Sequence, residues 1–276
     1  MTVPAAALGL ALAAAFVHAL WNVLLARARD AQAATAVALL VAVSVFAPVA
    51  ALTWDVRAGV WPFVVASSCL QLLYFVLLAA AYRRAPLSVV YPLARGAAPV
   101  LVLLIGVVAL GWSSSVGQVA GVLLVGAGIL LVRGVRRGGE ARAVTFGLAT
   151  ATCIAAYTLV DKHGITHAGP ISYLELTMVM PALVYAAAMV RLKGAGALGA
   201  ELGPGTLAAG LATFGAYVLV LAALERAPAA SVAAVRETSV VIAALLAGRV
   251  LDERVGPGRL LGAVLVAAGV ALVSLA

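Results

Sequence analysis

AYRRAPLSVVYPLARGAAPV occupies residues 81–100 of this chain, and ALERAPAASVAAVRETSVVI occupies residues 223–242. The two stretches align at an offset of 142 residues, which places Ala85-Pro86 on Ala227-Pro228. Further along, residues 117–132 align with residues 258–273 at an offset of 141 residues. An internal repeat limits which architectures a chain can adopt. The sequence therefore predicts two copies of one unit, residues 5–132 and residues 145–274.

The composition places most of this chain in lipid. Of its 276 residues, 65% are hydrophobic and 10% are charged, whereas soluble proteins have roughly 45–50% and about 25%. A transmembrane helix needs about 20 mainly apolar residues, and the sequence has ten such runs joined by short gaps. The runs are 4–26, 33–53, 60–81, 87–110, 117–133, 144–160, 170–190, 204–223, 229–250 and 257–275. They do not alternate apolar and polar residues as the strands of a membrane β-barrel do.

Each predicted half contains five runs, which is an odd number of crossings. The second half therefore enters the membrane from the opposite face, as in the inverted-topology repeats of secondary transporters. The predicted fold is an all-α polytopic membrane protein with ten transmembrane helices in two inverted five-helix repeats. Because this pseudo-symmetry allows two conformations that open to opposite sides, the pattern favours transport.

The basic residues are distributed unevenly among the loops. A net charge of +8 would suggest nucleic-acid binding in a soluble protein, but here the basic residues lie in short gaps between apolar runs, so we predict no nucleic-acid partner. The odd-numbered gaps hold 13 Lys and Arg residues, and the even-numbered gaps hold only Arg57, Lys162 and Arg226. The positive-inside rule then places the odd loops in the cytoplasm and both termini outside.

Five motifs follow one another along the chain: HALWN at 18–22, YPLARGAAP at 91–99, YTLVDKHG at 157–164, RETS at 236–239 and LDERVGPGRLLG at 251–262. Together they resemble the drug/metabolite transporter superfamily in its ten-helix EamA-type branch. The resemblance covers essentially the whole chain and implies two tandem EamA-like domains around a central cavity. It also implies a secondary transporter of small metabolites, often an exporter. Because it implies cytoplasmic termini, opposite to the charge distribution, the orientation stays open.

Ionisable residues inside the apolar runs are the candidate site residues, because each costs about 2.5–3.5 kcal/mol at mid-membrane. Arg95 and Glu237 are equivalent in the repeat, so near a pseudo-two-fold axis they can face each other. With Arg236 beside Glu237, the chain has one arginine more than is needed to neutralise that carboxylate. A guanidinium binds a carboxylate through two hydrogen bonds, so these three residues are predicted to bind an anionic substrate. The alternative is a buried salt bridge with a structural role.

A second group of candidates lies in the first run. His18 and Asn22 are spaced i, i+4, and Trp21 is three residues from His18, so the three share one helix face. Facing the bundle, they would offer imidazole, amide and indole groups to a substrate, whereas the alternative is an interhelical hydrogen bond. Tyr91 and Tyr157 are candidates for the cavity wall, or for packing and the interfacial aromatic belt.

Glu237, Glu175 and His18 are the candidate proton carriers, since carboxylates and imidazoles inside the membrane form the proton relays of transporters. Glu237 lies beside Arg236, which leaves Glu175 as the less restrained carboxylate. The alternative for Glu175 is a solvated position near the headgroups. The sequence predicts no metal site and no cofactor, and it lacks the GxxxxGK[ST] motif of an ATP-driven motor.

Prolines and glycines predict local features of the helices. Pro92 and Pro99 are predicted to interrupt the run 87–110 beside Arg95, and Pro181 is a second candidate kink. The run 229–250 has no proline at the matching positions.

Two GxxxG pairs occupy equivalent places in the fifth and tenth runs, Gly117 with Gly121 and Gly258 with Gly262. Small residues at this spacing permit close helix contact. The contact could pack these two helices within one chain or join two chains, so both a monomer and a homodimer are open.

The predicted function is secondary transport of a small metabolite, such as an amino acid or organic anion, by alternating access with candidate proton coupling. The alternatives are a membrane-embedded enzyme and a non-transporting scaffold. The chain lacks the HExxH and GxSxG motifs of such enzymes, so we predict no enzymatic activity. The predicted partners are a small-molecule substrate and the lipid bilayer. A bias to 16 Arg against 2 Lys suggests a high-GC bacterium, and so a bacterial inner membrane.

Overall fold

The computed structural model describes residues 3–25, 27–84, 87–133, 141–239, 241–242 and 257–276 of the chain. The side chains of Asn22 and Tyr91 lie outside what it describes, as do residues 240 and 243–250 of the predicted run 229–250. The statements below concern the described residues.

The described chain is almost entirely helical. Its elements are α1 (Ala5–Leu25), α2 (Ala31–Leu52), η1 (Ala58–Val60), α3 (Trp61–Arg84), α4 (Leu87–Val108), α5 (Val116–Arg133), α6 (Ala141–Gly164), α7 (Pro170–Lys193), α8 (Ala195–Gly199), α9 (Pro204–Arg226), α10 (Ala229–Arg236) and α12 (Pro257–Leu275). Each predicted apolar run contains one of the longer helices or α10. The short η1 and α8 were not predicted, because neither is long enough to produce an apolar run.

Five segments are long and apolar enough to cross a membrane: Ala31–Leu52, Ala58–Leu78, Val144–Gly164, Pro170–Lys193 and Pro204–Arg226. Further apolar helices of 10–17 residues lie in α1, α4, α5 and α12. Large aliphatic side chains are exposed along these helices, among them Val65 and Val264. Water would penalise such a surface, whereas lipid accepts it. The chain is therefore a multi-pass membrane protein.

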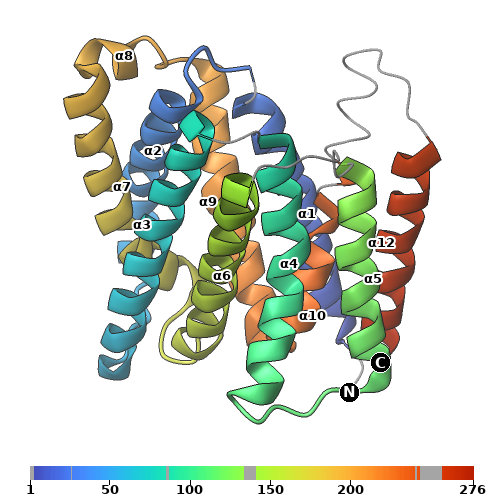
Figure 1. The fold of residues 1–276 in the computed structure, drawn as a ribbon. Helices are drawn as coiled ribbons and strands as arrows, with labels where there is room; N and C mark the ends of the chain where they lie inside the picture. The colour runs from blue at the N-terminus through green and yellow to red at the C-terminus, as the bar shows by residue number, and fades with distance from the viewer. Residues whose placement is uncertain (1–2, 26, 85–86, 134–140, 240, 243–256) are drawn as a thin grey trace.

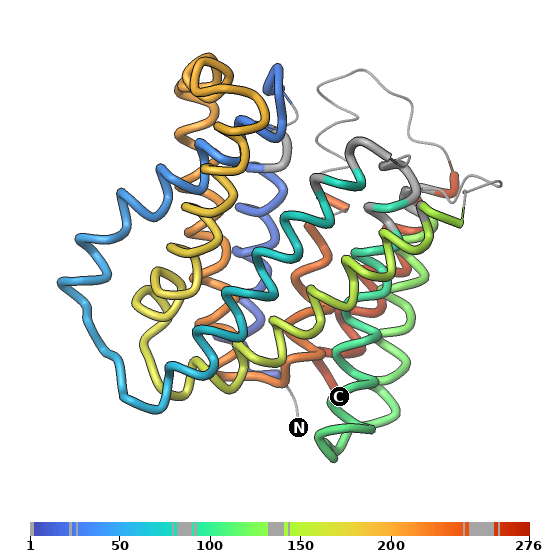
Figure 2. The backbone as a smooth tube through the Cα atoms, turned by 60° about the vertical axis from the view of Figure 1, so that its left-hand side comes forward, coloured from blue at the N-terminus to red at the C-terminus, as the bar shows by residue number. Residues whose placement is uncertain are grey.

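The helices form two groups in which both halves of the chain take part. In one group α1 packs along α9, and α2 packs on α7 and α9. In the other, α6 packs on α3 and α4, and α5 packs on α4 and α12. Figure 2 shows these groups side by side, and both figures show the two termini at the same end of the molecule. Contacts of α3 with α7 and of α1 with α10 join the groups.

Helices α5 and α12 approach each other at glycines. A Cβ atom on Gly121 would lie 2.7 Å from the carbonyl oxygen of Gly269, and one on Gly128 would lie 2.7 Å from that of Gly262. Of the two alternatives for the GxxxG pairs, the structure therefore shows packing within one chain for Gly121 and Gly262. Gly258 has no atom within 4 Å of its Cβ position, so the second pair takes part through one glycine only.

Opposite ends of the bundle are fixed by different polar contacts. At the end that carries the termini, Lys162 donates hydrogen bonds to the carbonyl oxygens of Leu224 and Ala227, where the last carbonyls of α9 have no helical partner. At the other end, Asp30 accepts hydrogen bonds from the first backbone N–H groups of α2 and from Lys193 Nζ at 2.5 Å. The Lys162 contacts join the end of α6 to the end of α9, and the Lys193–Asp30 contact joins the two halves of the chain.

Asp30 lies outside the spans, and the hydrogen bond from Lys193 is the main reason that its pKa is lowered from the usual value. We expect Asp30→Ala to lower the free energy of unfolding by about 1 kcal/mol, because α2 loses its N-cap. Lys193→Met removes only the exposed ion pair and should cost less.

The same carboxylate makes stability depend on pH. A carboxyl group whose pKa is lowered in the folded state stabilises the fold above its unfolded-state pKa, and this contribution is lost as pH falls through the folded-state pKa. Thermal unfolding in detergent across acidic pH measures both effects, and equal losses in the two variants would contradict the capping role.

Candidate functional site

Helix α10 ends in the middle of the bundle, directly before a buried carboxylate. It runs from Ala229 to Arg236, and Glu237 forms a turn whose N–H bonds to Ala234 and Val235 carbonyls. By contrast, α4 is helical throughout Leu87–Val108. The predicted interruption of that run at Pro92 and Pro99 is therefore wrong. A proline removes one backbone donor, and packing against α5 and α6 holds the helix together there.

Glu237 lies between two arginines from different halves of the chain. Its Oε1 atom is 3.3 Å from Arg95 Nη1 and 3.5 Å from Arg236 Nη2. Arg95, Arg236 and Glu237 are 5%, 3% and 0% exposed, so these charges are withdrawn from solvent. Two cations thus share one carboxylate. Both ion pairs left open by the sequence are present, and they meet on a single oxygen.

Two polar atoms of this cluster are buried without a hydrogen-bond partner among the described residues, Arg236 Nε and Glu237 Oε2. A buried donor or acceptor that stays unpaired costs about 1–3 kcal/mol, and more in charged groups. Buried polar groups are nearly always satisfied in proteins. Among the described residues, the Arg236 Nε–H thus stays available to an acceptor such as a molecule bound in the site.

Arg95 contacts His18 as well as Glu237. The Arg95 Nη2 atom is 2.5 Å from His18 Nε2, and Trp21 Nε1–H donates to His18 Nδ1 at 3.0 Å. Arginine and the indole N–H are donors only, and a neutral imidazole has one acceptor nitrogen. The ring can therefore accept only one of these two hydrogen bonds, and a protonated ring could accept neither. This geometry requires a neutral His18.

A cavity with about 90 Å³ of water-accessible space lies beside these groups, which is enough for several water molecules. Its wall comes from α1, α2, α3, α4, α6, α7, α9 and α10, so both halves of the chain contribute. Arg95 and Arg236 both line it. The lining residues lie well inside their helices, which places the cavity in the interior of the bundle.

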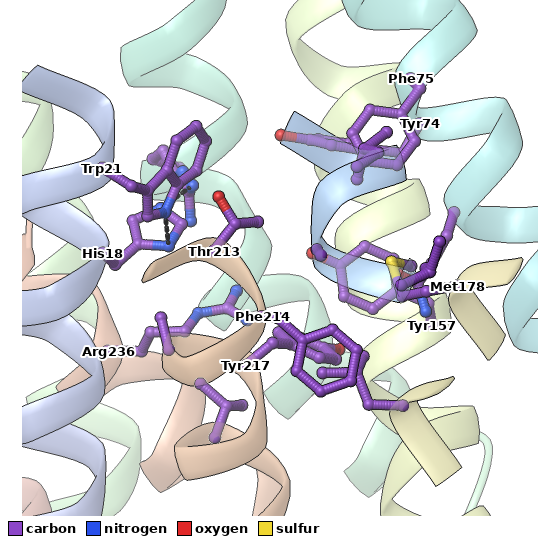
Figure 3. Close-up of a pocket in the computed structure, with 18 residues that line it drawn as sticks. His18, Trp21, Tyr74, Phe75, Tyr157, Met178, Thr213, Phe214, Tyr217 and Arg236 are labelled. Carbon is purple, nitrogen blue, oxygen red and sulfur yellow. Dashed lines mark hydrogen bonds between the residues drawn. The ribbon is translucent and has the colours of Figure 1, made fainter. Parts of the chain in front are cut away.

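The cavity has two chemically different walls. Figure 3 shows His18, Trp21 and Arg236 on one side, and Tyr74, Phe75, Tyr157 and Met178 facing them from the other. Phe214 and Tyr217 of α9 lie between the two. Aromatic faces and a thioether bind apolar groups, while a guanidinium binds an anion. This arrangement suits a small amphipathic molecule with one acidic end.

Comparisons with known proteins agree with this architecture. Residues 141–275 match a family model described as the EamA-like transporter family. Through these residues, the second half of the chain is similar to the EamA-like transporter family. A solved structure described as "Crystal structure of protein" is similar over 97% of this chain and 98% of its own, with a TM-score of 0.76 and 17% identity. That likeness shows the fold alone. A comparison with curated proteins finds no match.

Similarity to the EamA-like family suggests a membrane transporter of small molecules. Most of the sequence-predicted site residues of this EamA-like chain come together at the cavity. Arg95, Arg236, His18, Trp21 and Tyr157 all line it. Glu237 lies behind the arginines and is not among the described lining residues. Asn22 and Tyr91 were also predicted, and their side chains lie outside the described part of the chain.

Glu175 lies apart from this cluster. Its side chain belongs to α7, is buried at 7% exposure and has an Oε2 atom without a hydrogen-bond partner. The alternative of a well-solvated Glu175 does not fit this burial. Glu175 is not among the described residues that line the cavity, so its predicted role in proton transfer stays a prediction.

Sequence reasoning noted Asp161 at the end of its apolar run but gave it no role, and it missed much of the aromatic wall of this EamA-like site. Asp161 is 0% exposed and accepts hydrogen bonds from two tyrosines, Tyr173 and Tyr217. An acidic residue one position after an apolar run is the only sequence signal for it. Nothing in the sequence distinguishes Phe214 or Tyr217 from aromatic residues that pack in the core.

Proposed function

We propose that this EamA-like protein is a secondary transporter for a small organic anion or amino acid. It works by alternating access with proton coupling in a bacterial inner membrane, and the family resemblance suggests export. The observation that carries this proposal is Arg236. This buried arginine lines the cavity, shares its carboxylate with Arg95 and keeps an unpaired Nε–H. A substrate carboxylate would provide the missing acceptor.

Two features support an inverted repeat as the moving framework. At the offset of 141, Gly121 corresponds to Gly262 and Gly128 to Gly269, so the two glycine contacts between α5 and α12 exchange with each other. Arg95 and Glu237 correspond at 142 and are in direct contact. Contacts between equivalent residues are expected on a pseudo-two-fold axis. Repeats 5–132 and 145–274 would then exchange roles as the cavity opens to either side.

The experiment compares uptake of small carboxylates and amino acids into proteoliposomes by the parent and by Arg236→Gln. We expect the variant to fold, because it keeps the Arg95–Glu237 pair, and to transport at least about tenfold more slowly below saturation. The lost interaction is a hydrogen bond between charged groups, worth about 1.5–3 kcal/mol. A pH gradient applied across the same vesicles tests proton coupling.

Arg226→Gln is the matched control. It removes an arginine from the exposed end of α9, where Arg226 pairs with Glu225 at 2.8 Å. Exposed pairs contribute little, so transport should be unchanged. If Arg236→Gln transports as fast as Arg226→Gln, Arg236 does not bind the substrate. Failure of the parent to accumulate any substrate would favour the enzyme or scaffold alternative.

A further inference from the structure

Asp161 is a buried carboxylate whose described contacts are hydroxyl groups. It lies in the last turn of α6, with Oδ1 accepting from Tyr173 at 2.8 Å and Oδ2 accepting from Tyr217 at 2.6 Å. The described residues provide no lysine or arginine nitrogen within 4.0 Å of it. Two tyrosines satisfy a carboxylate without neutralising it. Its charge must therefore be balanced by groups farther away or removed by a proton.

The two tyrosines differ in what lies behind them. Tyr217 lines the cavity, whereas Tyr173 is 0% exposed and is not among the described lining residues. Asp161 is therefore separated from a molecule in the cavity by a single phenol. The charged and titratable groups around Asp161 come from its own helix, α7, α9 and α10: Tyr157, Tyr173, Tyr217 and Arg236. The neighbouring Lys162 is directed to backbone carbonyls of α9 and the loop after it.

Among the described residues around the cavity, the charges of two arginines and two carboxylates sum to zero when Asp161 is ionised. Arg95 and Arg236 are balanced by Glu237 and Asp161, while the contacts of His18 require a neutral ring. Binding of a monovalent anion would add one uncompensated negative charge in a poorly solvated site. An unpaired buried charge is costly. Uptake of one proton by Asp161 would restore neutrality.

Hydrogen bonding acts in the same direction as charge. While Asp161 is ionised, the Tyr217 hydroxyl donates to it. Once Asp161 is protonated, its own O–H can donate to the Tyr217 oxygen, because a tyrosine hydroxyl both donates and accepts. The Tyr217 O–H is then released toward the cavity, where it can bind the carboxylate of a substrate. A proton on Asp161 therefore strengthens anion binding, and by reciprocity a bound anion favours that proton.

We infer that Asp161 is the proton-binding residue of this transporter and that one proton and one organic anion occupy the protein together. The inference rests on the proposed function and names its coupling site. The other candidates fit this role less well. Glu237 forms ion pairs with two arginines, which favour its ionised form. A protonated His18 would have N–H groups facing the N–H donors of Arg95 and Trp21. Glu175 is not among the described residues that line the cavity.

Calorimetric titration of the purified full-length protein in detergent tests the linkage, with benzoate as the anionic probe and benzamide as its neutral isostere. Comparing buffers of different ionisation enthalpy counts the protons taken up on binding. For the parent we expect proton uptake with benzoate and none with benzamide. Benzoate affinity should fall by up to about tenfold per pH unit once Asp161 is ionised, the limit for one linked proton.

Asp161→Asn mimics the protonated carboxyl, because its amide can donate to Tyr217. This variant should bind benzoate without proton uptake and with an affinity that no longer falls as pH rises. Tyr217→Phe and Tyr173→Phe form a matched pair, since each removes one hydroxyl from Asp161. Only Tyr217→Phe should weaken benzoate relative to benzamide, because only Tyr217 reaches the cavity.

Undiminished proton uptake in Asp161→Asn, or its loss in Glu175→Gln instead, would overturn the assignment to Asp161. Equal effects of the two tyrosine substitutions would also contradict it. Failure of the proposed function gives a different result, because the parent would then bind benzoate no better than benzamide. A third result is possible, in which the preference for benzoate over benzamide is lost in Arg236→Gln while Asp161→Asn changes neither affinity nor proton uptake. This result would support the proposed function and contradict only the assignment of the proton to Asp161.

Discussion

Glu237→Leu is expected to remove most of the folded protein, whereas Arg95→Leu is expected to keep most of it. Glu237 is fully buried and is the carboxylate in contact with both Arg95 and Arg236. Removing one partner of a buried ion pair costs about 3–5 kcal/mol, because the other charge stays buried and uncompensated. Arg95→Leu removes one of the two arginines and leaves Glu237 paired with Arg236 at 3.5 Å, so neither remaining charge of the cluster loses its partner.

Yield of monodisperse protein and thermal unfolding in detergent measure this prediction. The double variant Arg95→Leu/Glu237→Leu should be as unstable as Glu237→Leu, because it leaves Arg236 buried without that carboxylate. Transport by Arg95→Leu then separates the two interpretations of the pair. We expect reduced transport, since Arg95 lines the cavity. A Glu237→Leu variant as stable as the parent would show that the cluster contributes no net stability.

Gly121→Ala is expected to destabilise the bundle, whereas Gly258→Ala is expected to be tolerated. The new Cβ at residue 121 would lie 2.5 Å from a methyl carbon of Val273 and 2.7 Å from the carbonyl oxygen of Gly269. Helices in lipid associate through close packing of small residues, and backbone atoms can move away only if the helices separate. Overpacking of this kind costs about 1–3 kcal/mol.

Gly258 belongs to the equivalent GxxxG pair and has open space around its Cβ position. Alanine at residue 258 would create no steric clash, and its backbone loses less conformational entropy on folding than that of glycine. Both substitutions change helix propensity in the same way, but only Gly121→Ala disturbs a helix contact. The difference between the two thermal unfolding temperatures therefore measures the effect of the contact. Equal stability of the two variants would mean that the close approach of α5 and α12 does not stabilise the protein.

Hydropathy and the repeat offset predicted several particular features correctly. Apolar runs gave the places of the described helices, because a segment in lipid must satisfy its own backbone hydrogen bonds and so becomes a helix. The offset of 142 brought Arg95 and Glu237 together as a candidate pair, and the structure has them in contact. Five residues predicted for the site line one cavity, because ionisable and polar groups in lipid are driven toward the interior.

Other features could not be read from local sequence. Proline spacing predicted an interruption in α4, but the helix that ends beside the site is α10, which lacks proline and glycine. The turn at Glu237 allows its carboxylate to meet two arginines, one of them from the other half of the chain. The energy of these ion pairs comes partly from a contact between segments far apart in sequence, so helix propensity, which is a local property, cannot predict the turn.

The sequence by itself determined that this chain crosses a membrane many times, that some of its stretches match at a nearly constant offset, and which few residues could form a polar site. These properties follow from composition and order, because lipid excludes charge regardless of the detailed packing. Only the tertiary structure decided that Tyr217 joins Asp161 to the cavity and that His18 lies between Arg95 and Trp21. Such contacts depend on how helices from both halves pack and rotate against one another, and no local pattern specifies that rotation.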